Sequence, residues 1–201
     1  MRKHIQIIAG ILLLLASNAM MGQDKASELV NNLSKSLKKH KNTEVIFTYQ
    51  SPGSSEAKDG QVFLQNDAYK IILEEQHTIS DGNLIWTYLV EEEEMYISKV
   101  DENSDSPVQL FTDLEKESTP KLKGTDANGN TVIELYDNRG NSMDITLKFD
   151  KKGDLKRLEM QYEEGTLVFN ITDIKFDLDF EDGFFAFDEK AYPNVDIIDM
   201  R

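Results

Sequence analysis

The segment ISDGNLIWTYLVEEEEMYIS, residues 79–98, sets an apolar and aromatic run between an Asp-Gly-Asn turn and four consecutive glutamates. Aspartate, glycine and asparagine favour tight turns, because glycine and asparagine tolerate a positive φ angle. Side chains alternate between the two faces of a strand. Both faces of this strand are apolar, one with Leu84, Trp86, Tyr88 and Val90 and the other with Ile85 and Leu89. The segment therefore predicts a strand covered on both sides, in a hairpin that bends at the glutamates.

The same two-residue period continues on both sides of this hairpin. Apolar residues alternate with polar ones in four further runs: Val45, Phe47 and Tyr49; Tyr69, Ile71 and Leu73; Met143, Ile145, Leu147 and Phe149; Ile174, Phe176, Leu178 and Phe180. Turn sequences such as Asp59-Gly60, Asn128-Gly129 and Glu164-Gly165 separate such runs. The pattern predicts a long antiparallel meander.

Two segments have helical spacing instead. Residues 24–41 place Ala26, Leu29, Val30, Leu33 and Leu37 on one stripe, behind a candidate N-cap at Asp24. In residues 104–123, Pro107 can open a helix, and Leu110, Phe111 and Leu114 follow at helical spacing. We therefore expect one amphipathic N-terminal helix and one short mid-chain helix.

The first 22 residues have the order of a bacterial secretory signal. Arg2, Lys3 and His4 precede the short apolar run Ile5–Ala16, and small and polar residues follow up to Gly22. We expect residues 1–22 to be removed and residues 23–201 to form one exported, soluble domain. The chain has no cysteine to carry a lipid or form a disulfide.

The acidic composition argues against two classes of partner. The formal net charge is −15, and loss of Arg2 and Lys3 with the signal would make it −17. Phosphates of nucleic acids and anionic lipid surfaces repel such a chain. We expect neither as a partner.

Candidate catalytic and metal sites are weak. Glu91–Glu94 could supply carboxylates to a cation, but consecutive strand residues point to opposite faces and no calcium-loop spacing is present, so a solvated bend is favoured. The three histidines do not form one site, because His4 leaves with the signal, His40 ends an exposed helix and His77 lies in a predicted strand. Without cysteine or a nucleophile-elbow motif, covalent catalysis has no candidate. We expect no enzyme activity, no metal and no cofactor.

The strands offer more apolar surface than the two predicted helices can cover. A second sheet could pack on the first as a sandwich, or one sheet could curl around an apolar hollow. Periodicity alone leaves both arrangements open.

Four motifs, in order along the chain, resemble the periplasmic outer-membrane lipoprotein carriers, the LolA-like proteins. An amphipathic helix leads into a strand containing Phe47-Thr48, and the strand Gly60–Leu64 leads to Tyr69. The most specific motif is the hairpin Ser80–Tyr88 with its Ser-Asp-Gly turn and tryptophan. Phe185-Ala186-Phe187, Pro193 and Val195–Asp199 complete the set.

The resemblance implies an α+β fold: a strongly curved antiparallel sheet forming an unclosed β-barrel, with the two helices covering its concave apolar face. It implies a monomeric periplasmic carrier that binds lipoprotein acyl chains, receives them from an inner-membrane lipoprotein-releasing transporter and delivers them to an outer-membrane acceptor. The alternative is an exported lipid-binding or envelope-stress sensing domain of the same fold. The ligand-binding residues expected on this basis are Leu29, Leu33, Leu37, Val45, Phe47, Tyr49, Tyr69, Ile71, Leu73, Leu84, Trp86 and Tyr88.

One position departs from the family pattern. The family often has a basic residue followed by proline between the second strand and the aromatic residue, and this position is linked to opening of the cavity. Gln65 and Asn66 occupy it here, so the gating role does not carry over.

Overall fold

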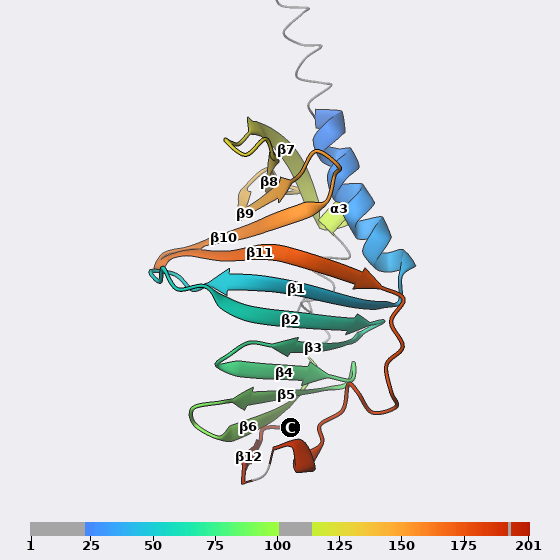
Figure 1. Cartoon of the computed structure of the whole chain (residues 1–201), viewed down its shortest axis with the longest axis vertical. Helices are drawn as coiled ribbons and strands as arrows, with labels where there is room; N and C mark the ends of the chain where they lie inside the picture. Colours follow the sequence, from blue (N-terminus) through green and yellow to red (C-terminus); the bar gives the residue numbers. More distant parts are fainter. Residues whose placement is uncertain (1–22, 101–113, 193) are drawn as a thin grey trace, which may run out of the picture.

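The computed structural model describes residues 23–100, 114–192 and 194–201, and its strands form one twelve-stranded sheet (Figure 1). The order is β12-β6-β5-β4-β3-β2-β1-β11-β10-β9-β8-β7. The sheet is not closed, because β12 and β7 lie at its two edges. The bounds are β1 (Asn42–Gln50), β2 (Lys58–Gln65), β3 (Ala68–Ile72), β4 (Gln76–Ser80), β5 (Leu84–Leu89), β6 (Glu94–Lys99), β7 (Ser118–Thr125), β8 (Thr131–Asp137), β9 (Ser142–Phe149), β10 (Leu155–Tyr162), β11 (Gly165–Phe176) and β12 (Asp196–Asp199).

The predicted meander is confirmed as two runs of hairpins. Strands that follow one another in sequence pair antiparallel from β1 to β6 and from β7 to β11, and the antiparallel pairing of β1 with β11 joins the two runs. The exception is β12, which pairs parallel to β6. The chain therefore returns to the far edge of the sheet at its C-terminal end.

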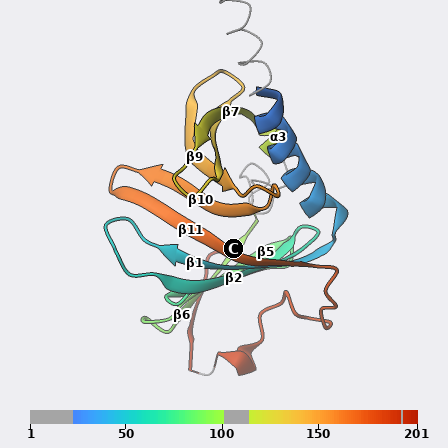
Figure 2. The ribbon, with the colours of Figure 1, turned by 45° about the horizontal axis from the view of Figure 1, so that its top comes forward.

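The N-terminal helix, residues 23–39, packs on one face of the sheet, which we call the helix face (Figure 2). Ala26 and Val30 are fully buried there. Directly paired strand residues point to the same face, so the apolar residues of β8, β9 and β10 meet in one core beneath the helix. This upper core consists of Ala26, Val30, Leu114, Ile133, Leu135, Ile145, Leu147, Phe149, Leu155 and Leu158.

The opposite face of the sheet is covered over β2–β6 by the segment of residues 177–192, which we call the C-terminal strap. Phe180 and Phe184 of the strap pack edge-on against Phe63 of β2. Further down, Tyr192 packs on Tyr88. Beneath the strap, a second cluster of buried residues consists of Ile79, Trp86, Met95 and Ile97. The partly buried residues Leu84, Tyr88, Phe187, Tyr192 and Val195 pack against these four. We call this the strap cluster.

The short mid-chain helix expected in residues 104–123 is not seen as a cover for the sheet. Residues 104–113 lie outside the described residues, and α3 (Leu114–Glu117) is a single turn. From Ser118 onward the chain is the edge strand β7. Pro120 explains part of this difference, because proline lacks the N–H that a helix interior needs but is tolerated in an edge strand.

Candidate functional site

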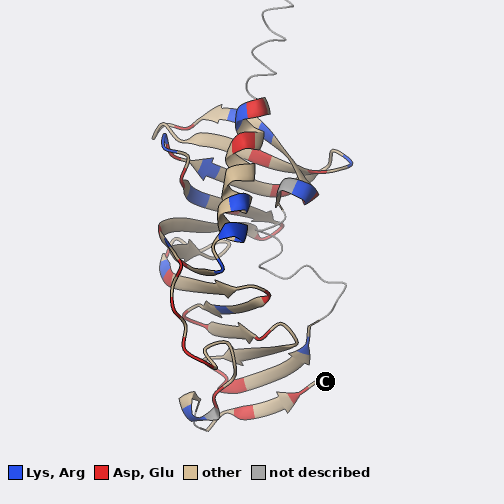
Figure 3. Cartoon of the chain, turned by 90° about the vertical axis from the view of Figure 1, so that its right-hand side faces the viewer, with Lys and Arg blue, Asp and Glu red and all other residues tan. Residues whose placement is uncertain are grey.

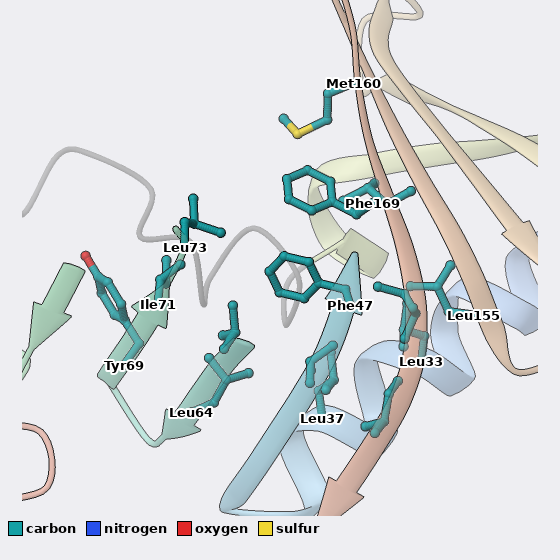
Figure 4. Close-up of a pocket in the computed structure, with 15 residues that line it drawn as sticks. Leu33, Leu37, Phe47, Leu64, Tyr69, Ile71, Leu73, Leu155, Met160 and Phe169 are labelled. Carbon is teal, nitrogen blue, oxygen red and sulfur yellow. The ribbon is translucent and has the colours of Figure 1, made fainter. Parts of the chain in front are cut away.

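An apolar cavity of about 290 Å³ lies on the helix face at the centre of the sheet (Figure 4). The second half of the N-terminal helix, strands β1–β3 and strands β10–β11 enclose it. Only Tyr69 among its lining residues has a polar side-chain atom. The lining residues are Leu33, Leu37, Val45, Phe47, Val62, Leu64, Tyr69, Ile71, Leu73, Leu155, Leu158, Met160, Phe169, Ile171 and Ile174.

Strand register explains why these side chains converge. Val62 pairs with Ile71 and Leu64 pairs with Tyr69, so β2 and β3 present matching residues to the same face. On the other side of β1, Phe47 pairs with Ile171 and Val45 with Ile174.

A β-bulge in β11 contributes part of this wall. Ile171 and Ile174 are three residues apart, a spacing that points side chains to opposite faces in a regular strand. The register between β1 and β11 shifts at Ile46/Phe47, so that Thr172 is an extra residue in β11. Because a bulge absorbs one residue, both isoleucines face the cavity.

Gly60 gives the ring of Phe47 its place in the cavity. A Cβ atom at position 60 would lie 2.3 Å from Cε2 and 2.7 Å from Cζ of Phe47, and 3.1 Å from Cδ2 of Leu73. No side chain other than hydrogen fits there without moving the ring. The pairing of Gly60 with Phe47 across β1 and β2 thus makes room for the most central aromatic ring of the wall.

Polar side chains at one end of the cavity connect β1 and β2 to the β3–β4 turn. The hydroxyl of Tyr49 on β1 donates to the carboxylate of Glu75 in the β3–β4 turn, and the backbone N–H of Glu74 donates to the same hydroxyl at 3.3 Å. Lys58 Nζ lies 3.2 Å from a carboxylate oxygen of Glu74 and 3.7 Å from one of Glu75. These contacts hold the turn that carries Leu73 against β1. We call them the rim latch.

The titration of the latch follows from burial and from these bonds. Burial and the hydrogen bond to Glu75 raise the pKa of Tyr49 well above that of a free tyrosine. Burial alone would raise the pKa of Glu75, but the bond from Tyr49 and the charge of Lys58 outweigh it and lower this pKa. Tyr49 therefore stays protonated as a donor and Glu75 stays ionised as an acceptor over the neutral range.

Comparison with known families decides the classification. The sequence model described as outer membrane lipoprotein carrier protein LolA matches residues 74–188, more than half of the chain. The chain belongs to the LolA family. Membership groups it with the lipoprotein-binding proteins of the bacterial envelope. Among curated proteins, none matches the sequence significantly.

Solved structures are similar in fold at low sequence identity. An uncharacterized conserved protein from Thermus thermophilus is 13% identical, with 87% of this chain and 99% of that chain covered and a TM-score of 0.55. A LolA superfamily protein from Nitrosomonas europaea is 12% identical, with coverages of 82% and 98% and a TM-score of 0.41. The MucA/MucB complex from Pseudomonas aeruginosa matches at 15% identity, with coverages of 83% and 62% and a TM-score of 0.39. At these identities the Thermus structure supports the fold alone.

Seven of the twelve residues expected to bind ligand line this LolA-family cavity: Leu33, Leu37, Val45, Phe47, Tyr69, Ile71 and Leu73. Leu29 packs against the upper core, and its Cδ2 lies near Gly153. Tyr49 is 2% exposed and belongs to the rim latch. Burial raises the pKa of Tyr69, and a hydrogen bond with Ser80 lowers it in part.

Leu84, Trp86 and Tyr88 lie on the opposite face of the sheet, in or against the strap cluster. Tyr69 pairs with Ser80, and Ser80 pairs with Ile85. Ile85, not Trp86, therefore shares the face of the cavity. The sequence could not decide this point, because both parities of β5 are apolar.

Eight lining residues were not expected from the sequence: Val62, Leu64, Leu155, Leu158, Met160, Phe169, Ile171 and Ile174. Val62 and Leu64 alternate within the family-like strand motif, so their parity with Tyr69 could have identified them. The residues of β10 and β11 required the pairing of β11 with β1, which joins segments more than a hundred residues apart.

The acidic bend is not part of the cavity wall, although the N–H of Val90, just before it, donates to the carbonyl of Glu75 at 3.0 Å. Glu91, Glu92 and Glu93 are exposed in the turn between β5 and β6, and Glu93 has a φ of 55°. Within residues 23–100, 114–192 and 194–201, no three histidine, cysteine, aspartate or glutamate side chains gather closely enough to hold a metal ion. The same residues include no helix with the length and apolarity needed to cross a membrane.

The departure from the family pattern at the β2–β3 turn has a conformational explanation. Asn66 has a φ of 53°, in the left-handed region. Proline is fixed near −65° and cannot adopt this angle, whereas asparagine tolerates it. Gln65 donates from Nε2 to Oδ1 of Asn42 at 3.1 Å, which ties the turn to β1.

Proposed function

We propose that the protein is a periplasmic carrier that holds acyl chains of lipoproteins in the central cavity and moves them from the inner to the outer membrane. The observation that carries this proposal is the chemistry of the cavity wall, where fourteen of fifteen lining residues are apolar and the fifteenth is Tyr69. Each buried methylene group contributes about 0.8 kcal/mol. An apolar chain is thus stabilised there without any chemical step.

The size of the cavity bears on the ligand. Ligand pockets usually enclose about 300–1,000 Å³. The cavity, at about 290 Å³, is at the lower end of this range. Such a volume suits one acyl chain or part of it, and a ligand with several chains would require the sheet and helix to separate further. We propose all fifteen lining residues as the binding site.

Export and transfer complete the proposal. Residues 1–22 would act as the secretory signal, and residues 23–201 would form the working domain. An inner-membrane lipoprotein-releasing transporter would load the cavity, and an outer-membrane acceptor would offer the acyl chains a better site. Family membership supports this direction of transport, which no contact within the chain specifies.

A binding titration tests the proposal. A triacylated lipopeptide and a fluorescent acyl probe are titrated into the protein in detergent-free buffer, and saturable binding is expected. In the double variant Phe47→Glu, Ile71→Glu, binding should be lost, because unpaired charges in an apolar site cost several kcal/mol. The control Glu91→Gln, Glu92→Gln changes exposed residues and should bind normally. A folded double Glu variant that binds as tightly as the unchanged protein would contradict the proposal.

Transfer between vesicles separates a carrier from a sensor of the same fold. A carrier should move the bound lipopeptide from donor to acceptor vesicles faster than the peptide moves alone. Tight binding without transfer would support the sensing alternative.

A further inference from the structure

One side of the cavity wall ends at β3, next to a strand that carries hydroxyl groups on the same face. Tyr69 of the wall pairs with Ser80 of β4, and Ile71 of the wall pairs with Thr78. Directly paired residues share a face and have Cβ atoms about 4.5–5.5 Å apart. The cavity wall therefore continues directly into the helix face of β4.

Register extends this face across β5 and β6, which follow β4 in the sheet (Figure 1). Directly paired residues form two rows from β4 to β6, and five of their six side chains carry a hydroxyl group. We call these five residues the hydroxyl band. The rows are one of Thr78, Thr87 and Tyr96 and one of Ser80, Ile85 and Ser98.

The strap face of the same three strands has the opposite character. Ile79, Trp86 and Met95 are buried there in the strap cluster. On the helix face, Thr78 and Thr87 are only partly buried. The three strands thus direct most of their apolar side chains away from the cavity face and their hydroxyl groups toward it.

The hydroxyl band suits an uncharged ligand group. β4 and β5 contain no aspartate, glutamate, lysine or arginine, so both strands are tan in Figure 3. In β6, Glu94 shares the helix face and accepts a hydrogen bond from the hydroxyl of Tyr96 at 2.5 Å, whereas Lys99 pairs with Leu84 of the strap face. Within their described residues, these strands place no cation on the helix face for a phosphate or carboxylate. Hydroxyl groups donate instead to a neutral carbonyl oxygen.

Several hydroxyl groups are available for such a bond. In the part of the chain that the structure describes, the side chains of Thr87 and Ser98 make no hydrogen bond. Tyr69 supplies the one oxygen among the side chains drawn in Figure 4, and burial raises its pKa, so the hydroxyl keeps its proton at neutral pH. Ser80 is fully buried, and its Oγ accepts from the N–H of Gly82 at 3.2 Å, so Ser80 supports the turn.

We propose that the acyl chain leaves the cavity at β3, and that Tyr69, Thr87 and Ser98 donate hydrogen bonds to neutral carbonyl groups of the ligand's head, such as those of an acyl ester or amide. The inference deepens the proposed function and rests on it, because it requires an acyl chain in the cavity. Chain and head lie on one face of one sheet, on either side of the pairing of β3 with β4.

Two neutral ligands that differ in one carbonyl group test this assignment. A fluorescent acyl probe is bound to the protein and displaced with monolauroyl glycerol or with monododecyl glycerol ether, which have the same head and chains of equal length. Apolar burial alone favours the ether, because a carbonyl group loses its hydrogen bonds to water on entering an apolar site. Donors in the site reverse this order, and the ester should displace the probe at about fivefold lower concentration.

Two double variants that remove the same groups locate the donors. Tyr69→Phe, Thr87→Val keeps the size of both side chains and should abolish the preference for the ester, with little change in the affinity for the ether. The control Tyr88→Phe, Thr119→Val removes one hydroxyl from the strap face and one from the edge strand β7, and it should keep the preference.

An ether that displaces the probe as well as the ester from the unchanged protein would overturn the inference and leave chain binding intact. So would an ester preference that survives in Tyr69→Phe, Thr87→Val. The comparison in the unchanged protein stands even if a variant does not fold. If the probe itself did not bind, the proposed function would fall together with the inference.

Discussion

Replacing Gly60 by alanine should push the ring of Phe47 into the cavity. The new Cβ atom would lie 2.3 Å from Cε2 of Phe47, and ordinary contact begins at about 3.4 Å, so the ring must move by at least 1.1 Å. The new Cβ atom would also lie 3.1 Å from Cδ2 of Leu73, so this side chain must shift slightly as well. Because the Phe47 ring lines the cavity, its displacement away from position 60 reduces the space there.

The energetic consequence follows from overpacking, which typically costs about 1–3 kcal/mol. The lower conformational entropy of unfolded alanine, about 0.5–1 kcal/mol in its favour, offsets part of this cost. Each lost kcal/mol lowers the melting temperature of a domain of this size by about 2–4 °C. We therefore expect a loss of a few degrees and about tenfold weaker binding of long acyl probes.

The assay is a series of titrations with acyl probes of increasing chain length. The loss should grow with chain length, because a smaller cavity excludes the outer methylene groups first. Phe47→Leu removes the ring atoms that the new methyl group meets, so Gly60→Ala should have little further effect on affinity in that background. Unchanged affinity across the series in the single variant would refute the placement of the Phe47 ring in the binding cavity.

Three further predictions concern the rim latch, the tryptophan and the acidic bend. Tyr49→Phe should destabilise the protein by about 1 kcal/mol at neutral pH and speed release of an acyl probe in stopped-flow measurements. The pKa of Glu75 is lowered in the folded state, so the stability that the latch contributes is present above the pKa of a free glutamate and is lost as the pH falls through the folded value. The unfolding free energies of the two proteins, measured by chemical denaturation, should therefore converge in acid. A difference that stays constant with pH would argue against the latch. Trp86 emission should hardly change on ligand binding, whereas the tryptophan of Leu64→Trp in a Trp86→Phe background should be quenched by brominated acyl chains; strong quenching of Trp86 would place the ligand on the strap face. Changing Glu91–Glu94 to glutamine should leave melting insensitive to calcium and chelator, and a chelator-dependent loss of several degrees in the unchanged protein would reveal a metal site.

The sequence predicts the elements better than it predicts their pairing. Alternation in segments such as Val45–Tyr49 and Tyr69–Leu73 is a local property, and the strands form where it occurs. The parity of β5 is different, because Trp86 and Ile85 are both apolar and only the register through β4 assigns Ile85 to the cavity face. Local patterns also give no sign of the parallel pairing of β12 with β6.

The cavity wall formed by the helix, β1 and β3 was predicted from the sequence, whereas the wall formed by β10 and β11 was missed. Both outcomes depend on how close the segments lie in the sequence. The helix and β1–β3 lie next to each other in sequence, so residues such as Leu37 and Phe47 could be assigned together. Ile171 and Ile174 break the two-residue period, and only a bulge brings both to one face. A regular alternation starting at Ile174 instead extends the strand to Leu178 and Phe180, which the structure places after the end of β11.

Photocrosslinking with a diazirine at the end of an acyl chain tests the central claim most directly. The probe is irradiated with the protein, and the modified peptides are sequenced by mass spectrometry. We predict adducts on the helix face, on residues of β1–β3, β10 and β11 such as Phe47, Leu64 and Met160, with competition by unlabelled acyl ligand. Competable adducts on Leu84, Trp86 or Tyr88 of the strap face, with none on the cavity wall, would contradict the account.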